Sequence, residues 1–244
     1  MTGFVSGRMD SNHRYPAPKA GAIAARRRPV TEREYMENRY DGQLIIFRII
    51  DEYYPEDISF LPVISPFRFL VTVMLSASTT DRQAAAAAER LFSAYPSAED
   101  IASAPREDIK ALIASAGLSE AKSRNIKQTS AIIARDGIPE TLEELVRLPG
   151  VGEKTAACYL VTILNKPGVI ADTHFVRVAR RLGFTDTEDR TKSAREIRER
   201  YPEDIWARLS MTLNLHGRTF CKAKPVCPGC PVSALCPSRE AFAG

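Results

Sequence analysis

The sequence is divided into short segments, most of which carry their own signal for beginning or ending a helix. Residues that cap helix N-termini, each followed by a capping partner or by a proline at the first helical position, stand at Thr31, Ser65, Ser97 and Thr141. Gly117 and Gly137 stand where left-handed C-caps are expected. No segment shows the period-two alternation of a half-buried strand. The sequence therefore predicts an all-α body from residue 31 onward, with helices that end at Gly117 and Gly137.

The positive charge of the chain is concentrated in its first thirty residues. The formal net charge is +4, and residues 1–30 carry six Arg or Lys against one Asp, so the rest of the chain is close to neutral. This segment has no apolar periodicity, which predicts a disordered basic tail with weak affinity for nucleic acid; an organellar transit segment is the alternative. The longest apolar runs, residues 44–50 and 69–75, are far shorter than the roughly 18 residues of a membrane span.

Four of the five cysteines lie within sixteen residues near the C-terminus, separated by five, two and five residues. They are Cys221, Cys227, Cys230 and Cys236. Zinc ribbons usually take two CxxC pairs from distant turns, whereas one loop around a single CxxC suits a cubane whose four irons each take one thiolate. We therefore expect a [4Fe–4S] cluster, with zinc or two disulfides as alternatives. The fifth cysteine, Cys158, is expected to be a small core residue.

The segment LPGVGEK, at residues 148–154, predicts a tight turn that leads into a helix. Glycine permits positive φ angles and close approach of a partner, so Gly150, Val151 and Gly152 are expected to direct backbone amides outward. The helix that begins near Glu153 adds its positive dipole end at the same place. Such a turn can cradle a phosphate. An ordinary helical hairpin with glycine at the bend is the alternative.

Lys154 and Asp172 are candidates for a pair of reacting groups. Helix 153–165 runs about 18 Å away from the turn at 1.5 Å per residue, and residues 166–171 span about 20 Å when extended. The chain can therefore bring Asp172 back to the level at which Lys154 began. Asp172 also stands where the next helix needs an N-cap, and the two roles are compatible. The alternative for Lys154 is a solvated surface charge.

Together these segments, LPGVGEKTA and VIADTHFVRVARRLGF followed by LHGRTFC and the four cysteines, resemble the endonuclease III family of helix-hairpin-helix DNA glycosylases. The resemblance covers most of residues 31–236. It implies two α domains flanking a DNA-binding groove: a six-helix domain with the helix-hairpin-helix over residues 57–166, and an iron–sulfur cluster domain from residues 31–56 and 167–244. It also implies excision of oxidised pyrimidines from duplex DNA, followed by cleavage of the strand.

The resemblance also implies roles for individual residues. Lys154 would attack C1′, expel the base and form a Schiff base that permits β-elimination, while Asp172 would stabilise positive charge on the sugar. Leu118 would fill the gap that a flipped nucleotide leaves; a hydrophobic C-cap contact after Gly117 is the alternative. Ser78 stands where the family usually has glutamine, and serine is too short to fill the gap or to bond the orphaned base.

The cysteine loop departs from the family as well, because its first interval has five residues where six are usual. Lys222 and Lys224 lie in that interval and are expected to bind phosphates of DNA. Arg177 is expected either to face the cluster as a compensating charge or to be a structural, solvated arginine.

Two other functions are compatible with the sequence. One is a cluster-bearing DNA-binding protein with weak or absent glycosylase activity, which Ser78 makes conceivable. The other is an adenine-mismatch glycosylase, a branch that lacks the lysine and carries a further C-terminal domain. We expect a monomeric enzyme that acts on damaged or abasic duplex DNA and has no membrane partner. Its expected location is the cytoplasm, at the nucleoid, or an organelle or the nucleus in a eukaryote.

Overall fold

The computed structural model describes residues 39–55, 58 and 60–242, and within them the regular structure is entirely helical, as predicted. The α-helices are α2 (Arg39–Tyr53), α3 (Pro66–Leu75), α4 (Asp81–Ala94), α5 (Ala98–Ser103), α6 (Arg106–Leu112), α7 (Ser119–Asp136), α8 (Leu142–Leu145), α9 (Glu153–Leu164), α10 (Thr173–Arg181), α11 (Arg190–Arg200) and α12 (Trp206–Thr219). Short 3₁₀ turns are η1 (Ala114–Ala116), η2 (Glu203–Ile205), η3 (Cys227–Gly229), η4 (Ser233–Leu235) and η5 (Glu240–Phe242). The capping signal at Thr31 and the expected basic tail lie outside the described residues.

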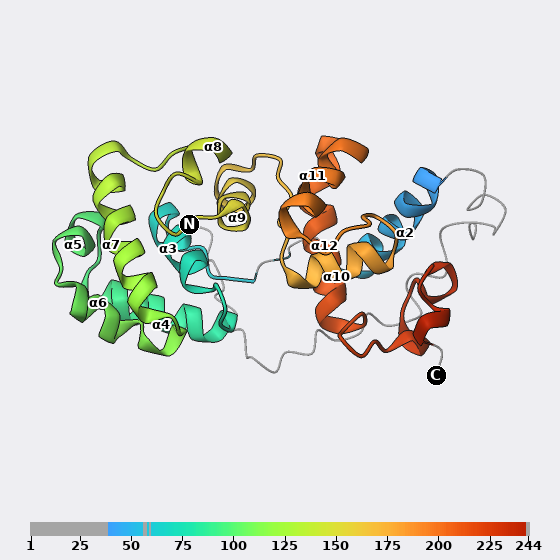
Figure 1. Cartoon of the computed structure of the whole chain (residues 1–244), viewed down its shortest axis with the longest axis horizontal. Coiled ribbons are helices and arrows are strands. Elements are labelled where there is room, and N and C mark those ends of the chain that lie inside the picture. Colours follow the sequence, from blue (N-terminus) through green and yellow to red (C-terminus); the bar gives the residue numbers. More distant parts are fainter. Residues whose placement is uncertain (1–38, 56–57, 59, 243–244) are drawn as a thin grey trace, which may run out of the picture.

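The described chain forms two lobes that lie side by side along the long axis of the molecule (Figure 1). In the first lobe, helices α3 to α9 enclose a hydrophobic cluster that includes the fully buried Leu70, Leu91 and Ile126. In the second lobe, α2 packs against α12 and joins α10 and α11 around a separate cluster that includes Ile46 and Phe175. Each lobe therefore buries an apolar core of its own, which is the dominant favourable contribution to folding.

Several helices begin where the capping signals of the sequence predict. The side chains of Ser65, Ser97 and Thr141 accept hydrogen bonds from backbone N–H groups in the first turns of α3, α5 and α8. A capping box at Thr80, which begins α4, was not predicted. Because the first N–H groups of a helix have no partner inside it, these side chains help to fix where each helix begins.

The helix expected to end at Gly117 ends five residues earlier. Helix α6 ends at Leu112, and Ile113 has φ −99° and ψ 7°, outside the α-helical region. The chain then tightens into η1, where the Ala116 N–H donates to the Ile113 carbonyl at 2.9 Å. Gly117 has a positive φ of 67° and ends that turn. Gly137 has φ 81° at the end of α7, as predicted.

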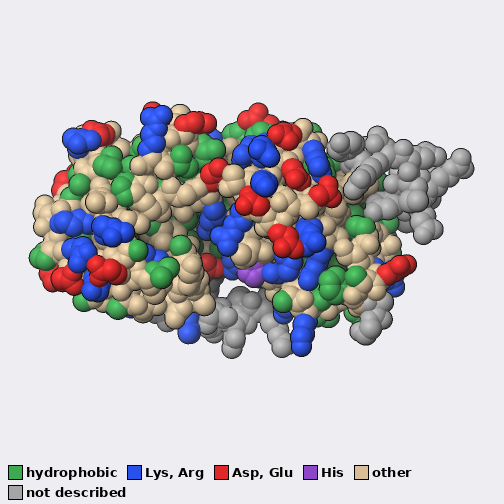
Figure 2. Space-filling model, in the orientation of Figure 1, with side chains coloured by type: hydrophobic (Ala, Val, Ile, Leu, Met, Phe, Trp, Pro, Cys, Tyr) green, Lys and Arg blue, Asp and Glu red, His purple; other side chains and the backbone are tan. Residues whose placement is uncertain are grey.

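The surface is hollowed between the two lobes, and lysine, arginine and histidine side chains line the depression (Figure 2). After α12 the described chain forms only 3₁₀ turns and irregular loops, which hold the four clustered cysteines. Among the described helices, none is both long and apolar enough to cross a membrane.

Candidate active site

The turn between α8 and α9 holds the two glycines of the LPGVGEK segment. Gly150 has φ +79°, and a Cβ there would lie 2.8 Å from the side chain of Asn125, so the fold itself requires glycine. Gly152 has an ordinary φ of −94°, and a Cβ there would meet no described atom within 4 Å. The fold therefore does not require the second glycine, whose exposed backbone is open to a partner.

The residue between these glycines differs from the prediction. The Val151 side chain is buried in the core of the first lobe, and its N–H donates to the Leu148 carbonyl at 3.0 Å. The prediction that this amide points outward is wrong, because its hydrogen bond to the Leu148 carbonyl closes the turn. Helix α7 supports the turn from behind, where Thr129 Oγ1 donates to the Pro149 carbonyl at 2.8 Å.

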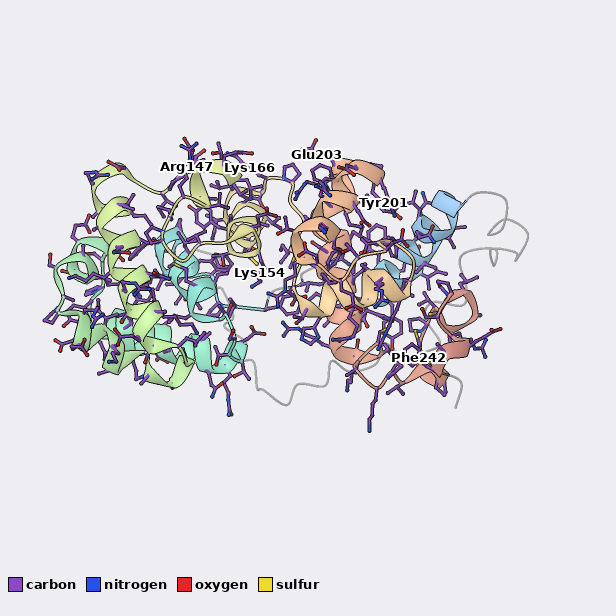
Figure 3. All side chains as sticks on the ribbon, viewed as in Figure 1. Arg147, Lys154, Lys166, Tyr201, Glu203 and Phe242 are labelled. Atoms are coloured by element: carbon purple, nitrogen blue, oxygen red, sulfur yellow. The ribbon has the colours of Figure 1, made fainter. Side chains whose placement is uncertain are left out.

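Lys154 lies in the first turn of α9, on the side of the first lobe that faces the second (Figure 3). Its half-buried side chain hydrogen-bonds Cys158, one turn further along the helix. Cys158 packs against the core of the first lobe, as predicted. Burial raises the pKa of its thiol, Lys154 lowers that pKa, and the carboxylates of Asp172 and Asp81 raise it. Charged groups of both lobes therefore influence this one thiol.

Asp172 is the N-cap of α10, as predicted, and both of its carboxylate oxygens accept hydrogen bonds. Oδ1 accepts from the Phe175 N–H at 2.8 Å, and Oδ2 accepts from Nδ2 of Asn214 on α12. Asn214 Oδ1 in turn accepts from Arg218 Nε at 2.8 Å. Arg218 Nη1 lies 2.6 Å from Asp81 Oδ2 at the start of α4. A polar chain therefore runs from the candidate carboxylate in the second lobe to the first lobe.

Three members of this chain were not predicted: Asp81, Asn214 and Arg218. Asn214 and Arg218 are four residues apart, a spacing that places two side chains on one face of a helix. That signal was available in the sequence. The approach of Asp81 was not, because it depends on how the two lobes pack together.

Ser78 and Leu118 occupy the tips of two loops of the first lobe, and both have backbone angles that are uncommon for residues other than glycine. Their φ angles are 59° and 50°. Both residues are exposed, and Leu118 has 65% of its surface accessible. This exposure argues against a hydrophobic C-cap contact for Leu118, since such a contact would bury the side chain.

The four clustered cysteines line one pocket in the second lobe, together with His216, Phe220 and Arg181. None of the five cysteines forms a disulfide. Within the described residues, no group of three or more His, Cys, Asp or Glu side chains is gathered closely enough to hold a single metal ion.

The environment of the cysteine sulfurs calls for a positive partner. Burial raises the pKa of Cys230 to about 11 and also raises that of Cys236, so these thiols form thiolates readily only beside a cation. Arg181 Nη1 lies 3.5 Å from the Cys221 sulfur, and His216 Nε2 lies 3.4 Å from that of Cys230. Neither Arg181 nor His216 was predicted.

The Arg177 side chain bonds backbone carbonyls at and near the start of the cysteine loop, as a structural arginine would. Its Nε donates to the Cys221 carbonyl at 3.0 Å and its Nη2 donates to the Gly217 carbonyl at 2.9 Å. Lys222 and Lys224 are exposed on the loop beside it.

Comparison with known proteins decides the family. Residues 71–203, more than half of the chain, match the model of the HhH-GPD superfamily of base excision DNA repair proteins. The chain belongs to this superfamily. Endonuclease III of Synechocystis sp. is 36% identical over 201 residues, which are 80% of this chain and 92% of that protein. Endonuclease III of Thermotoga maritima is 34% identical over 175 residues, 70% of this chain and 82% of that protein.

Solved structures agree with the HhH-GPD assignment. A trapped covalent intermediate of endonuclease III with DNA, an estranged-adenine complex, has a TM-score of 0.78 and 30% identity, and the match covers 83% of this chain and 99% of that one. A non-covalent endonuclease III–DNA complex has a TM-score of 0.77 and 31% identity, with 83% and 98% covered. The predicted fold and enzyme class, a base excision DNA glycosylase and abasic-site lyase, are thereby confirmed, and neither alternative function is favoured.

Proposed function

We propose that this HhH-GPD enzyme excises oxidised pyrimidines from duplex DNA and then cleaves the strand, with Lys154 as the nucleophile and Asp172 as its partner. The observation that supports the proposal is that Lys154 and Asp172, which come from different lobes, both influence the pKa of the same thiol, Cys158. A nucleophile and a carboxylate on opposite walls of a groove can act on the same sugar.

The groove offers several groups that suit duplex DNA. The open backbone at Gly152 and the N-terminus of α9 form a place for a phosphate. Lys222 and Lys224, which are exposed on the cysteine loop, are further candidates for binding phosphates. Leu118 is the candidate for entering the base stack when a nucleotide is flipped out, and the exposed Ser78, on the other loop, would lie beside the DNA without filling the gap.

The proposed chemistry uses the free amine of Lys154. Its Nζ forms a bond to C1′ while the bond between C1′ and the base breaks, and the base leaves with a proton. The sugar ring then opens to give a protonated Schiff base between Lys154 and C1′. Loss of a proton from C2′ expels the 3′ phosphate, which cleaves the strand. Hydrolysis of the Schiff base returns the amine.

Asp172 is well placed to support positive charge on the sugar because its carboxylate is held at both oxygens. The Phe175 N–H and the Asn214 amide fix its position, so the group does not have to be ordered when the charge develops. Asn214 and Arg218 therefore act through Asp172 as positioning residues.

We further propose that Cys221, Cys227, Cys230 and Cys236 hold a [4Fe–4S] cluster. The donor set fits, since four thiols share one pocket that also contains the donors Arg181 and His216. When bound, the cluster would supply iron–thiolate bonds that tie the loop to the end of α12. The loop would then present Lys222 and Lys224 to DNA. A monomeric state and a location with the cell's DNA remain predictions.

The test is covalent trapping with borohydride on duplexes that each contain one defined lesion or an abasic site. Wild-type protein is expected to be trapped and to cleave the strand. Lys154→Gln should abolish trapping, whereas Lys166→Gln, a change at an exposed lysine that bonds the Glu140 carbonyl, should leave it intact. Undiminished trapping by Lys154→Gln would overturn the assignment of the nucleophile. The lesion panel also shows which base is preferred and whether Ser78→Gln changes that preference.

A further inference from the structure

A buried lysine of the first lobe has no part in the chemistry above. Lys122 lies in the first turn of α7 and is 7% exposed. Its Nζ donates to three backbone carbonyls, at 2.8 Å to Leu75, 2.8 Å to Ala77 and 2.7 Å to Ala116. An ammonium group has three N–H donors and no acceptor, so every donor of this side chain is used.

These carbonyls belong to two loops that are far apart in the sequence. Leu75 ends α3, and Ala77 directly precedes Ser78. Ala116 ends η1, two residues before Leu118. A single ammonium group therefore joins the backbones beneath both exposed tips, each of which has a positive φ angle.

The position suits a positive charge. Carbonyls at the end of a helix lack partners within it and carry the negative end of its dipole, and both α3 and η1 end here. Burial lowers the pKa of Lys122, and the three carbonyls replace the water that burial removes from the amine. Without the amine, these carbonyls would lose a common partner and the two loops would lose this link.

We infer that Lys122 is a positioning residue that holds the loop of Leu118 at a fixed spacing from the loop of Ser78, so that Leu118 is in place to enter the DNA base stack. The inference rests on the proposed function. Flipping a nucleotide costs a few kcal/mol in lost stacking and pairing, and groups that enter the gap offset this best when they are held in place before binding. Lys122 therefore acts on extrusion of the base, and not on the bonds that Lys154 makes and breaks.

The same helix offers a matched control. Lys127, also on α7, donates to the carbonyls of Ala102 and Ala104 at 2.7 and 2.5 Å. It thus has the same chemistry at the end of α5, away from the two tips. Lys122→Met removes three carbonyl contacts and Lys127→Met removes two, and only the first change affects the link between the loops. Lys122→Arg keeps the charge, but its planar fork cannot reproduce three tetrahedral donors.

The experiment uses the full chain and separates base extrusion from lyase chemistry. Excision is measured under single-turnover conditions on a duplex with one oxidised pyrimidine and 2-aminopurine beside it, whose fluorescence reports unstacking. Lyase activity is measured on a single-stranded abasic oligonucleotide, which needs no extrusion. We expect Lys122→Met to lose about tenfold in duplex excision, equivalent to about 1.4 kcal/mol, along with the fluorescence change. Its single-strand lyase rate should stay within about twofold of wild type.

Lys127→Met should keep both activities and the fluorescence change. The inference is overturned if Lys122→Met excises as fast as Lys127→Met, or if its duplex and single-strand activities fall in equal proportion. If Lys122→Met does not fold, the same measurements on Lys122→Arg test the inference. A Lys122→Arg variant that extrudes the base as well as the wild-type protein would overturn it. A wild-type chain with neither excision nor lyase activity would instead refute the proposed function.

Discussion

The first lobe and the cysteine loop of the second lobe hold their shapes by different means. The first lobe has a continuous apolar core, capped helices, and loops tied by protein groups such as Lys122. The cysteine loop, residues 221–236, has only 3₁₀ turns as regular structure, and burial raises the pKa of two of its thiols, Cys230 and Cys236. The first lobe is thus ordered by its own side chains. The cysteine loop, in contrast, would be held in shape by the proposed [4Fe–4S] cluster.

Both regions contribute residues to the proposed function, so the comparison bears on it. In the proposed function the first lobe would supply the nucleophile, Lys154, and the loop tips at Ser78 and Leu118, which would have to be in place before DNA binds. The cysteine loop would supply the exposed Lys222 and Lys224. Changes in the first lobe should therefore act on extrusion and chemistry, and changes in the cysteine loop on DNA affinity.

The largest expected effect is loss of a cluster ligand. Cys227→Ser should abolish the broad visible absorption of the purified protein and lower affinity for duplex DNA by about tenfold or more. Hydrogen exchange should become faster in the cysteine loop while α3 and α7 stay protected. Cys158→Ser, outside the pocket, should keep the visible absorption. Equally faster hydrogen exchange in both lobes would contradict the prediction, because it would show that loss of the cluster ligand also destabilises the first lobe.

The second prediction compares the two glycines of the turn within the first lobe. Gly150→Ala should destabilise the protein by about 2 kcal/mol or more, because of its positive φ and the 2.8 Å approach to Asn125. Gly152→Ala should destabilise by less than about 1 kcal/mol but weaken DNA binding, since a methyl group there faces only the partner. Chemical denaturation and a binding titration measure the two effects. If Gly152→Ala binds DNA normally, the phosphate does not lie at this turn.

The parts of the structure that the sequence predicts are those set by local physics. Ser65 and Ser97 could be predicted as N-caps because each side chain bonds a backbone N–H only three residues further along the chain. Asp172 was identified as an N-cap for the same reason. Val151 was misassigned, because the choice between an outward amide and a bond that closes the turn depends on the core beneath it.

The missed residues are those that act through contacts between distant segments. Lys122 bonds carbonyls 47, 45 and 6 residues away, and no residue spacing in the sequence predicts these three contacts. Asp81 meets Arg218 only because the two lobes pack together. Local sequence therefore sufficed to propose Lys154 and the four clustered cysteines as site residues, whereas contacts such as that of Asp81 with Arg218 depend on tertiary packing.

The third prediction concerns the link between the lobes and the candidate carboxylate. Asn214 is 4% exposed, so Asn214→Leu keeps the volume and removes the amide that joins Asp172 to Arg218. Single-turnover excision should fall about fivefold to tenfold, with DNA affinity little changed. Asn214→Asp keeps an acceptor for Arg218 but repels Asp172, and it should be at least as slow. An Asn214→Asp variant with normal rates would show that Asp172 needs no support from α12.

The smallest expected effect concerns the ion pair between the lobes. Arg218 and Asp81 are each about one-third exposed, so their attraction is weakened by water and salt, and Asp81→Asn should lower stability by less than about 1 kcal/mol. The matched variant is Asp51→Asn, which removes the carboxylate that Arg208 contacts within the second lobe. Both losses should shrink as salt is added, when thermal unfolding is compared at low and high ionic strength. The two variants should differ in excision, because Asp81 is linked to Asp172 through Arg218 and Asn214, whereas Asp51 pairs with Arg208. If Asp81→Asn and Asp51→Asn excise equally fast, the pair contributes only to stability, and the two lobes keep their relative position through apolar packing.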